Sequence, residues 1–347
     1  MYKTRLSEAI TWLRFPLIFF IILLHCYSTV GLSGNHITYF KAIYPFSLWL
    51  GETGVPGFFF ISGLLFFLST KSYSQKLSSR IHTLLIPYFI WNALLLFIYV
   101  LTLFIGYPQE INGKSIADYT WIDYLRAFWD RGSYDNGNFV PVLCPFWYIR
   151  NLLIVSILSP LFFYPIKYLR EFFLVVIAVW WLFTPHNAFI SQTILFFSLG
   201  AYFSIHAINP LELFYKQKKL YLSLFFLFAV CDIVTHISYS TPFNLQIHRL
   251  ALIFNIPILF LVADYCCKLQ FSSKLFPNAA FIVFSVHYPI VVIIRKICIT
   301  QFRNASDLIH IFLYFLCIAF ATILSIIIYL ILNKYFPKVK GILSGNR

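Results

Sequence analysis

The feature that most constrains this chain is a series of apolar runs, most of them near the length of about 20 residues that spans a bilayer as a helix. The runs fall at about 12–31, 43–69, 82–105, 146–166, 172–184, 190–206, 220–237, 250–267, 278–294 and 308–333. The fifth run is short, and the second is long and rich in glycine. The pattern predicts an all-α fold, a polytopic membrane helical bundle with about ten transmembrane helices.

The composition excludes most other classes of protein. Only 11% of the 347 residues are charged and 60% are hydrophobic, whereas a soluble domain has about 25% charged residues. This excludes a cytosolic enzyme, a disordered tail and a secreted disulfide scaffold. The seven cysteines are an odd number, and all except Cys144 lie in or beside apolar runs. They predict neither a disulfide framework nor a metal site.

The excess of positive charge predicts how the chain crosses the membrane. Lys and Arg number 26 against 12 Asp and Glu, and basic residues collect in cytoplasmic segments, where they meet anionic lipid rather than nucleic acid. With both termini in the cytoplasm, Arg150 lies within a span and 17 of the 26 face the cytoplasm. The eight that would face outward are Lys41, Lys114, Arg126, Arg131, Arg249, Arg295, Lys296 and Arg303. This split favours a multi-pass membrane protein with both ends inside. The expected location is the bacterial inner or plasma membrane.

The chain is predicted to form a single integral membrane domain, 1–347, with one long loop at about 106–145. In the predicted topology this loop faces outward, and loops of this length often have a function. Its acidic residues are Glu110, Asp118, Asp123, Asp130 and Asp135. No internal repeat is visible, although many secondary transporters carry one. The sequence leaves the oligomeric state open.

Ionisable side chains within the apolar runs are expensive and are therefore candidates for function. Arg14 and His25 are eleven residues apart in the first run, which places them within about 20° of each other around a helix and roughly 16 Å apart along it. Arg14 alone is typical of a snorkelling anchor, and His25 alone of a polar contact between helices. Because Arg14 and His25 share one face of the helix, together they indicate a track from the cytoplasm to a buried reactive centre.

The second run carries one carboxylate, Glu52, followed by a segment rich in Gly and Pro at 54–63. Such backbone is tolerated in a membrane where it packs on protein or lines a cavity. Glu52 is expected at a depth similar to that of His25, where a carboxylate would hold the tautomer of the imidazole and raise its basicity. Alternatively, Glu52 only caps a helix break at the outer interface.

Two further arginines are candidates for contacts to an anionic ligand. Arg80 belongs to a basic cytoplasmic segment that usually serves topology alone, but arginine also binds phosphates through bidentate contacts. Arg150 lies one turn inside the fourth run, after Trp147 and Tyr148. These two aromatic residues are typical interface anchors.

Polar residues in the later runs are candidates for an outer vestibule. Asp232 and His236 lie one turn apart on one face of the seventh run, and His248 and Arg249 begin the eighth. Such residues also form ordinary polar rims at an outer surface. His287 precedes Tyr288-Pro289 in the ninth run, where it is either a further site residue or the satisfied polar group of a proline kink.

Taken together, these segments resemble the acyltransferase 3 family of integral membrane acyltransferases. The resemblance extends over the whole chain, and the order and spacing of the segments carry it. The matching segments are Arg14 and His25 with ten residues between them, then 54–63, 80–88, 147–150, 197–202 and 285–289. Many members have an acidic residue where this chain has Pro56, so any role of that carboxylate is either lost here or shifted to Glu52. The basic segment has fewer arginines than in many members, and the hydrolase-like domain fused to some members is absent.

The resemblance implies transfer of an acyl group, usually acetyl, from cytoplasmic acyl-CoA to a hydroxyl of a cell-surface polysaccharide, lipid-linked glycan or related cell-envelope sugar. It implies no bound cofactor beyond the acyl-CoA substrate. His25 would act as base or acyl carrier, aided by Arg14 and Glu52. Arg14, Arg80 and Arg150 would bind the donor. The residues expected on the acceptor side are Trp147, Tyr148, Asp232, His236, His248, Arg249 and His287.

Two other functions share the membrane bundle and the basic cytoplasmic face. One is a transporter or flippase for a glycan precursor, and the other is a structural partner within a glycan-assembly complex. The missing repeat, and the absence of acidic–basic pairs distributed along several spans, argue against the transporter.

Overall fold

The computed structural model describes residues 2–27, 36–106, 108–111, 113–130, 139–185, 189–238, 243–270 and 273–346. Arg131 and Asp135 of the expected outer loop lie outside these residues. The chain divides into two compact units. Unit 1 comprises Met1–Ser69 and Pro160–Ile327, and unit 2 comprises Thr70–Ser159 and Ile328–Arg347. The prediction of a single domain over 1–347 stays a prediction.

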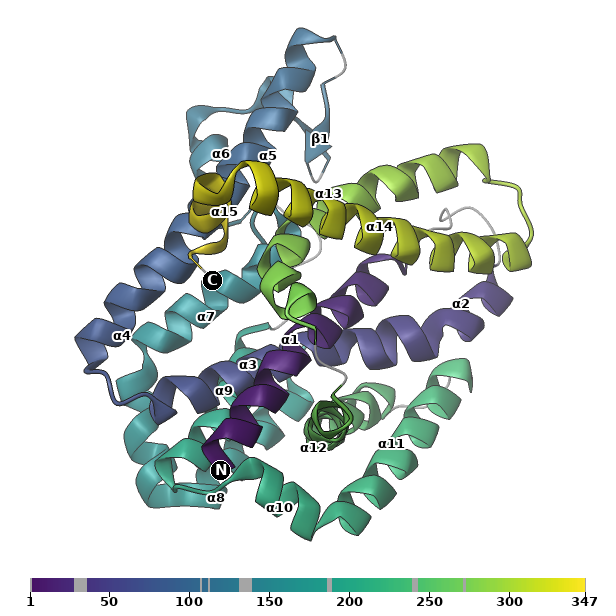
Figure 1. Ribbon diagram of the computed structural model, residues 1–347. Helices are drawn as coiled ribbons and strands as arrows, with labels where there is room; N and C mark the ends of the chain where they lie inside the picture. Colours follow the sequence, from purple (N-terminus) through teal and green to yellow (C-terminus); the bar gives the residue numbers. More distant parts are fainter. Residues whose placement is uncertain are drawn as a thin grey trace. The chain divides into compact units, whose positions relative to one another are not determined.

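Unit 1 is helical throughout its described part (Figure 1). Its elements are α1 (Tyr2–His25), α2 (Ile37–Tyr44), the π-helix η1 (Pro45–Leu50), α3 (Gly51–Leu68), α8 (Ser159–Phe183, from Pro160), α9 (Phe189–Ile205), α10 (Pro210–Lys216), α11 (Lys218–Ser238), α12 (Asn244–Lys268), α13 (Leu275–Gln301) and most of α14 (Asp307–Tyr335).

Unit 2 combines helices with the only strands that the described residues contain. Its elements are α4 (Tyr73–Arg80), the π-helix η2 (Ile81–Leu85), α5 (Ile86–Phe104), β1 (Glu110–Ile111), β2 (Lys114–Ser115), the 3₁₀ helices η3 (Ile116–Asp118) and η4 (Cys144–Phe146), α6 (Trp121–Arg126), α7 (Trp147–Ile157), the end of α14 and α15 (Pro337–Ser344). The two strands form an antiparallel pair within the expected loop.

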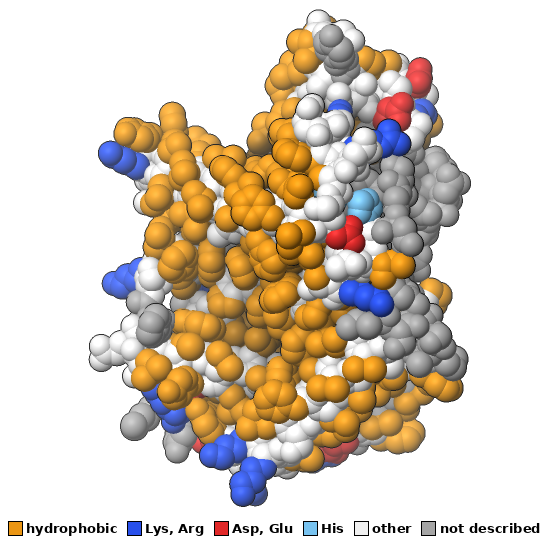
Figure 2. Space-filling model, turned by 90° about the vertical axis from the view of Figure 1, so that its right-hand side faces the viewer, with side chains coloured by type: hydrophobic (Ala, Val, Ile, Leu, Met, Phe, Trp, Pro, Cys, Tyr) orange, Lys and Arg blue, Asp and Glu red, His pale blue; other side chains and the backbone are white. Residues whose placement is uncertain are grey.

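The prediction of an all-helical membrane bundle is confirmed. Seven helices in the described part of the chain are long and apolar enough to cross a bilayer, and up to nine if each of two bent pairs counts as one span. Hydrophobic side chains cover most of the face seen in Figure 2, with few Lys and Arg among them. Phe172 on α8 and Phe312 on α14 are 68% and 65% exposed, as expected of side chains that face lipid. The protein is therefore an integral, multi-pass membrane protein.

Within the described residues the count is nine at most, where the apolar runs predicted about ten. The runs at 146–166 and 172–184 fall on one bent pair, Cys144–Ile157 with Ser159–Phe183. Pro160 stands in the first turn of α8, where its ring disfavours helical backbone in the residue before it. A second interruption lies at Arg170, whose φ of 50° departs from the helix. The cytoplasmic placement of both termini stays a prediction.

The core of unit 1 contains a close contact between α3 and α9 that requires glycine on both helices. A Cβ added to Gly63 would lie 2.0 Å from the carbonyl oxygen of Phe197, and one added to Gly200 would lie 1.9 Å from that of Phe60. Both distances are far inside van der Waals contact. Small residues permit such close approach in membranes, where helices gain little from apolar burial against each other.

Candidate functional site

Helix α1 carries both residues of the first predicted pair. Arg14 has an exposed side chain and forms no hydrogen bond or ion pair with the described residues. His25 ends the helix half-buried, and its ring lies against α13, with centroids 5.4 Å from His287 and 5.0 Å from Tyr288. The imidazole predicted to be reactive therefore has a second imidazole beside it.

The same two helices also contact each other closer to their N-termini. The rings of Phe15 on α1 and Phe276 on α13 lie 4.7 Å apart, ten and eleven residues before the pair formed by His25 and His287. Helices α1 and α13 thus run side by side in the same direction. Around Phe15 and Phe276 they line a cavity of about 860 Å³, with polar residues that include Thr11 and Asn278.

Helix α3 brings Glu52 to the level of His25, as the sequence predicted. A Cβ on Gly51 would lie 3.0 Å from the backbone nitrogen of Leu24, so the two helices touch one residue away from each functional group. The carboxylate of Glu52 is directed to α12, where its Oε2 lies 3.0 Å from Nε2 of His248. His248 is thus the observed partner of Glu52. The pairing of Glu52 with His25 stays a prediction.

His248 is held by a second carboxylate on its other side. Its Nδ1 lies 2.9 Å from Oδ2 of Asp232 on α11. Ionised carboxylates only accept hydrogen bonds, so an imidazole between two of them donates from both nitrogens and is a cation. The side chains of Asp232 and His248 are 0% and 5% exposed, and a buried charge requires such pairing.

Tyr44 and His236 complete this network. The Tyr44 hydroxyl donates to Oδ1 of Asp232 over 2.9 Å and lies 2.6 Å from Nδ1 of His236. That nitrogen also lies 2.9 Å from Asp232 Oδ1, as the one-turn spacing predicted. Four elements, α2, α3, α11 and α12, are therefore joined by buried and half-buried polar groups that satisfy one another. We call Tyr44, Glu52, Asp232, His236 and His248 the carboxylate network.

Arg249 follows the network on α12 and is bound to the end of α8. Its guanidinium donates to the carbonyls of Trp181, Thr184 and Pro185, the last two over 2.8 and 3.1 Å. It also lies over the Trp181 ring, 5.3 Å from the centroid. These contacts fix the start of α12, and with it the position of His248.

The arginines predicted to bind the donor outside α1 belong to unit 2. Arg150 is buried, donates to the carbonyls of Trp129 and Phe139 over 2.5 and 2.8 Å, and lies over both rings. Arg150 therefore connects the loop at 106–145 to the start of α7. In the same turn of α7, Trp147 is buried and Tyr148 is half-buried. Arg80 ends α4 half-buried. The donor-binding roles of Arg80 and Arg150 stay predictions.

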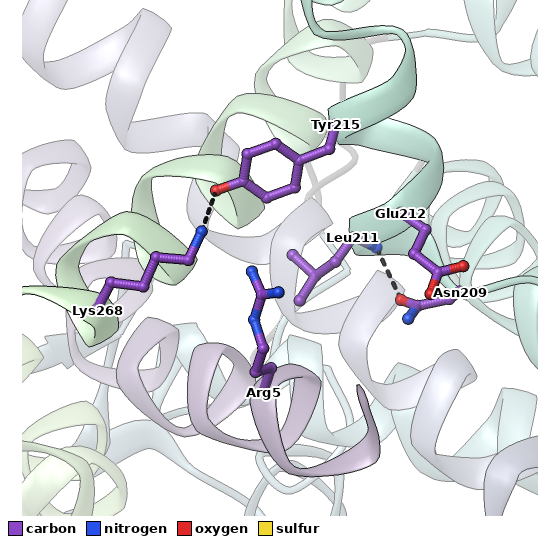
Figure 3. A pocket seen from close by; sticks show the side chains of 6 residues that line it. All are labelled: Arg5, Asn209, Leu211, Glu212, Tyr215 and Lys268. Atoms are coloured by element: carbon purple, nitrogen blue, oxygen red, sulfur yellow. Dashed lines mark hydrogen bonds between the residues drawn. The ribbon is translucent and has the colours of Figure 1, made fainter. Parts of the chain in front are cut away.

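A second, smaller cavity of about 320 Å³ lies in unit 1 where α1, α10 and α12 meet (Figure 3). Arg5 binds Asp264 through two nitrogens, with the shortest contact at 2.7 Å, and Lys268 reaches the same carboxylate over 2.8 Å. Figure 3 shows Lys268 directed at the hydroxyl of Tyr215, to which it donates over 3.2 Å. These cations are thus already paired.

Sequence reasoning missed several polar groups. Tyr44 precedes a proline in the second run, and no local signal shows that it reaches α11. His36 lies 2.7 Å from Asp307, although the two are 271 positions apart. Cys26 and Cys317 have sulfurs 3.4 Å apart. Within the described ranges, no group of three or more His, Cys, Asp and Glu is placed to hold a metal ion.

Comparison with known proteins gives the family. The family model described as an acyltransferase domain, Acyl_transf_3, matches residues 7–330. The chain belongs to the acyltransferase 3 family. This acyltransferase is also similar to the succinoglycan biosynthesis protein ExoH of Rhizobium meliloti (strain 1021), with 26% identity over 321 residues, covering 86% of this chain and 82% of that protein. No solved structure matches. The acyltransferase domain makes the protein a transferase that uses an acyl donor.

Proposed function

We propose that this membrane acyltransferase moves an acyl group, acetyl in the first instance, from cytoplasmic acyl-CoA to a hydroxyl of a cell-surface polysaccharide, a lipid-linked glycan or a related cell-envelope sugar. The family domain over 7–330 supports the acyl transfer. A relative named for the biosynthesis of succinoglycan, a polysaccharide, supports the class of acceptor.

The observation that carries this proposal is the arrangement of α1 and α13. A cavity lies at one end of their interface, and His25 lies beside His287 ten to eleven residues further along. Arg14 lies on α1 at the level of the cavity, next to the lining residue Phe15, and has no hydrogen-bond or ion-pair partner among the described residues. A cation at that place suits the phosphates of a CoA donor, which in the predicted topology enters from the same side.

Two routes fit an imidazole at His25. As a base, it takes the proton of the acceptor hydroxyl while the oxygen attacks the thioester carbon, and that proton passes to the departing CoA thiolate. As an acyl carrier, it attacks the thioester itself and releases the CoA thiol, after which the acceptor hydroxyl breaks the acyl–nitrogen bond. Both routes yield one acyl ester and one free thiol.

The carboxylate network is assigned to the acceptor side. Glu52 reaches the level of His25, and His248, Asp232 and Tyr44 hold its carboxylate in one orientation. A fixed carboxylate at this place is suited to orient a sugar hydroxyl or to support an imidazolium at His25.

The test compares surface glycans, by mass spectrometry, from cells with and without the gene. The proposal expects glycans of unchanged sugar composition that lack acyl esters. Restoring the wild-type gene should restore the esters, and the purified protein should release free CoA from acetyl-CoA when given the unacylated glycan. Loss of the sugar chain itself would contradict the proposal and favour the transporter or flippase. Unchanged glycans would contradict both.

A further inference from the structure

His287 lies in the middle of α13 with its side chain fully buried. Its Nδ1 lies 3.2 Å from the carbonyl oxygen of Val283, one turn earlier in the same helix. Since a carbonyl only accepts, Nδ1 carries the hydrogen, and in the neutral ring Nε2 carries a lone pair.

Nε2 of His287 is a buried acceptor with no hydrogen-bond partner among the residues that the structure describes. Buried polar atoms are normally satisfied, so an exception requires an explanation. The contrast with His248, whose two ring nitrogens both face carboxylates, shows that this protein can satisfy a buried imidazole fully. A ligand that brings a donor to Nε2 would remove the anomaly.

The surroundings of His287 indicate which ligand this is. Its ring packs against His25 at 5.4 Å and against Phe284 at 6.0 Å. Asn278, nine residues earlier on α13, lines the larger cavity, roughly 13 Å away along the helix axis. A ligand that reaches both imidazoles from this cavity has to be slender and to extend along α1 and α13.

The arm of an acyl-CoA has the required donor. Two methylene groups separate its thioester sulfur from an amide N–H, which loses its water when the arm enters an apolar helix interface. Two adjacent rings can contact two adjacent functional groups of the arm. We propose, building on the proposed function, that Nε2 of His287 accepts a hydrogen bond from this amide and so holds the thioester carbon at His25. His287 is then a positioning residue and not the base.

The experiment uses two small donors that differ in one group. S-acetyl-N-acetylcysteamine keeps the amide N–H, and S-acetyl-2-mercaptoethyl acetate has an ester oxygen in its place. The purified full-length protein is given each donor with the unacylated glycan from cells that lack the gene. Wild type should favour the amide donor by about tenfold in kcat/KM, the size of effect expected for one hydrogen bond.

Variants of α13 test where the amide is recognised. His287→Leu should lose the preference, and His287→Gln, whose side-chain oxygen can accept, should keep part of it. Ser285→Ala is the matched control, because this buried hydroxyl already donates to the carbonyl of Phe281 over 2.9 Å. It should leave the preference unchanged.

Three results would overturn the inference. The first is a wild-type protein that uses both donors equally, which requires no variant to fold. The second is a His287→Leu variant that still prefers the amide. The third is a His287→Gln variant as inactive as His25→Ala with both donors, which would make His287 a chemical group. If the wild type releases no CoA from acetyl-CoA and transfers no acyl group from either small donor, the proposed function itself fails, and this outcome is distinct from the other three.

Discussion

Two imidazoles buried in unit 1 have opposite environments. His248 lies between Glu52 and Asp232, and each of its ring nitrogens has a carboxylate partner. His287 uses Nδ1 for a carbonyl of its own helix and leaves Nε2 without a partner among the described residues. The first environment stabilises a charge in the absence of any ligand. The second leaves a buried acceptor unsatisfied beside His25, which is typical of a place where a bound substrate supplies the missing hydrogen bond.

The largest effect is expected from substitution of His25, the imidazole beside His287. His25→Ala should lower acyl transfer by about 10²-fold or more, the contribution of a general base, and by more if His25 carries the acyl group. Initial rates of CoA release from acetyl-CoA measure it, at matched amounts of inserted protein. Thr300→Ala, on the exposed end of α13, is the control. Near-normal activity of His25→Ala would remove His25 from the chemistry.

The second prediction exchanges both contrasted imidazoles for the same apolar residue. His248→Leu leaves the buried carboxylate of Asp232 and the half-buried one of Glu52 without the cation between them and should cost about 3–5 kcal/mol of stability. His287→Leu removes an unsatisfied acceptor and should leave stability nearly unchanged or slightly higher. Thermal unfolding in one detergent compares the two variants. Equal losses of thermal stability would mean that the two environments do not differ as described.

The sequence singles out candidate residues more readily than it predicts how they pair. The helical repeat places Arg14 and His25 on one stripe, and the one-turn spacing of Asp232 and His236 predicts the contact that the structure shows at 2.9 Å. The partner of Glu52 is 196 positions away on another helix. That pairing depends on how each helix rotates about its axis, which packing decides. Glycines at 51 and 54 signal a close neighbour but do not identify α1.

The number of spans shows the same limit. Hydropathy located the apolar segments, because the cost of exposing polar backbone to lipid acts on each segment alone. It could not show that 146–166 and 172–184 form one bent pair, since that depends on local backbone at Pro160 and Arg170. The tautomer of His287 likewise depends on the hydrogen bond from Nδ1 to the carbonyl of Val283, which no sequence pattern predicts.

A smaller effect is expected at the exposed cation of α1. Arg14→Ala should raise the KM for acetyl-CoA by about tenfold, because the donor phosphates lose one charge-assisted contact. Arg14→Lys should keep part of the affinity, since the positive charge remains although the bidentate geometry is lost. Steady-state kinetics with varied acetyl-CoA distinguish the two variants. If both behave alike, charge at this position does not determine donor binding.

The smallest effect is expected where an ion pair lies at the surface, in contrast to the buried network. Lys114 donates to Asp123 over 2.7 Å, and Thr120 donates to the same carboxylate. These bonds, that from Lys114 first, hold the pKa of Asp123 well below its usual range. A lowered carboxyl pKa adds stability above the unfolded value, and that stability is lost as the pH falls through the folded value. Lys114→Ala should therefore lower the Tm only slightly at pH 7, since exposed pairs contribute little, and the difference from wild type should shrink in acid. A loss as large as that of His248→Leu would show that exposure does not separate the two kinds of pair.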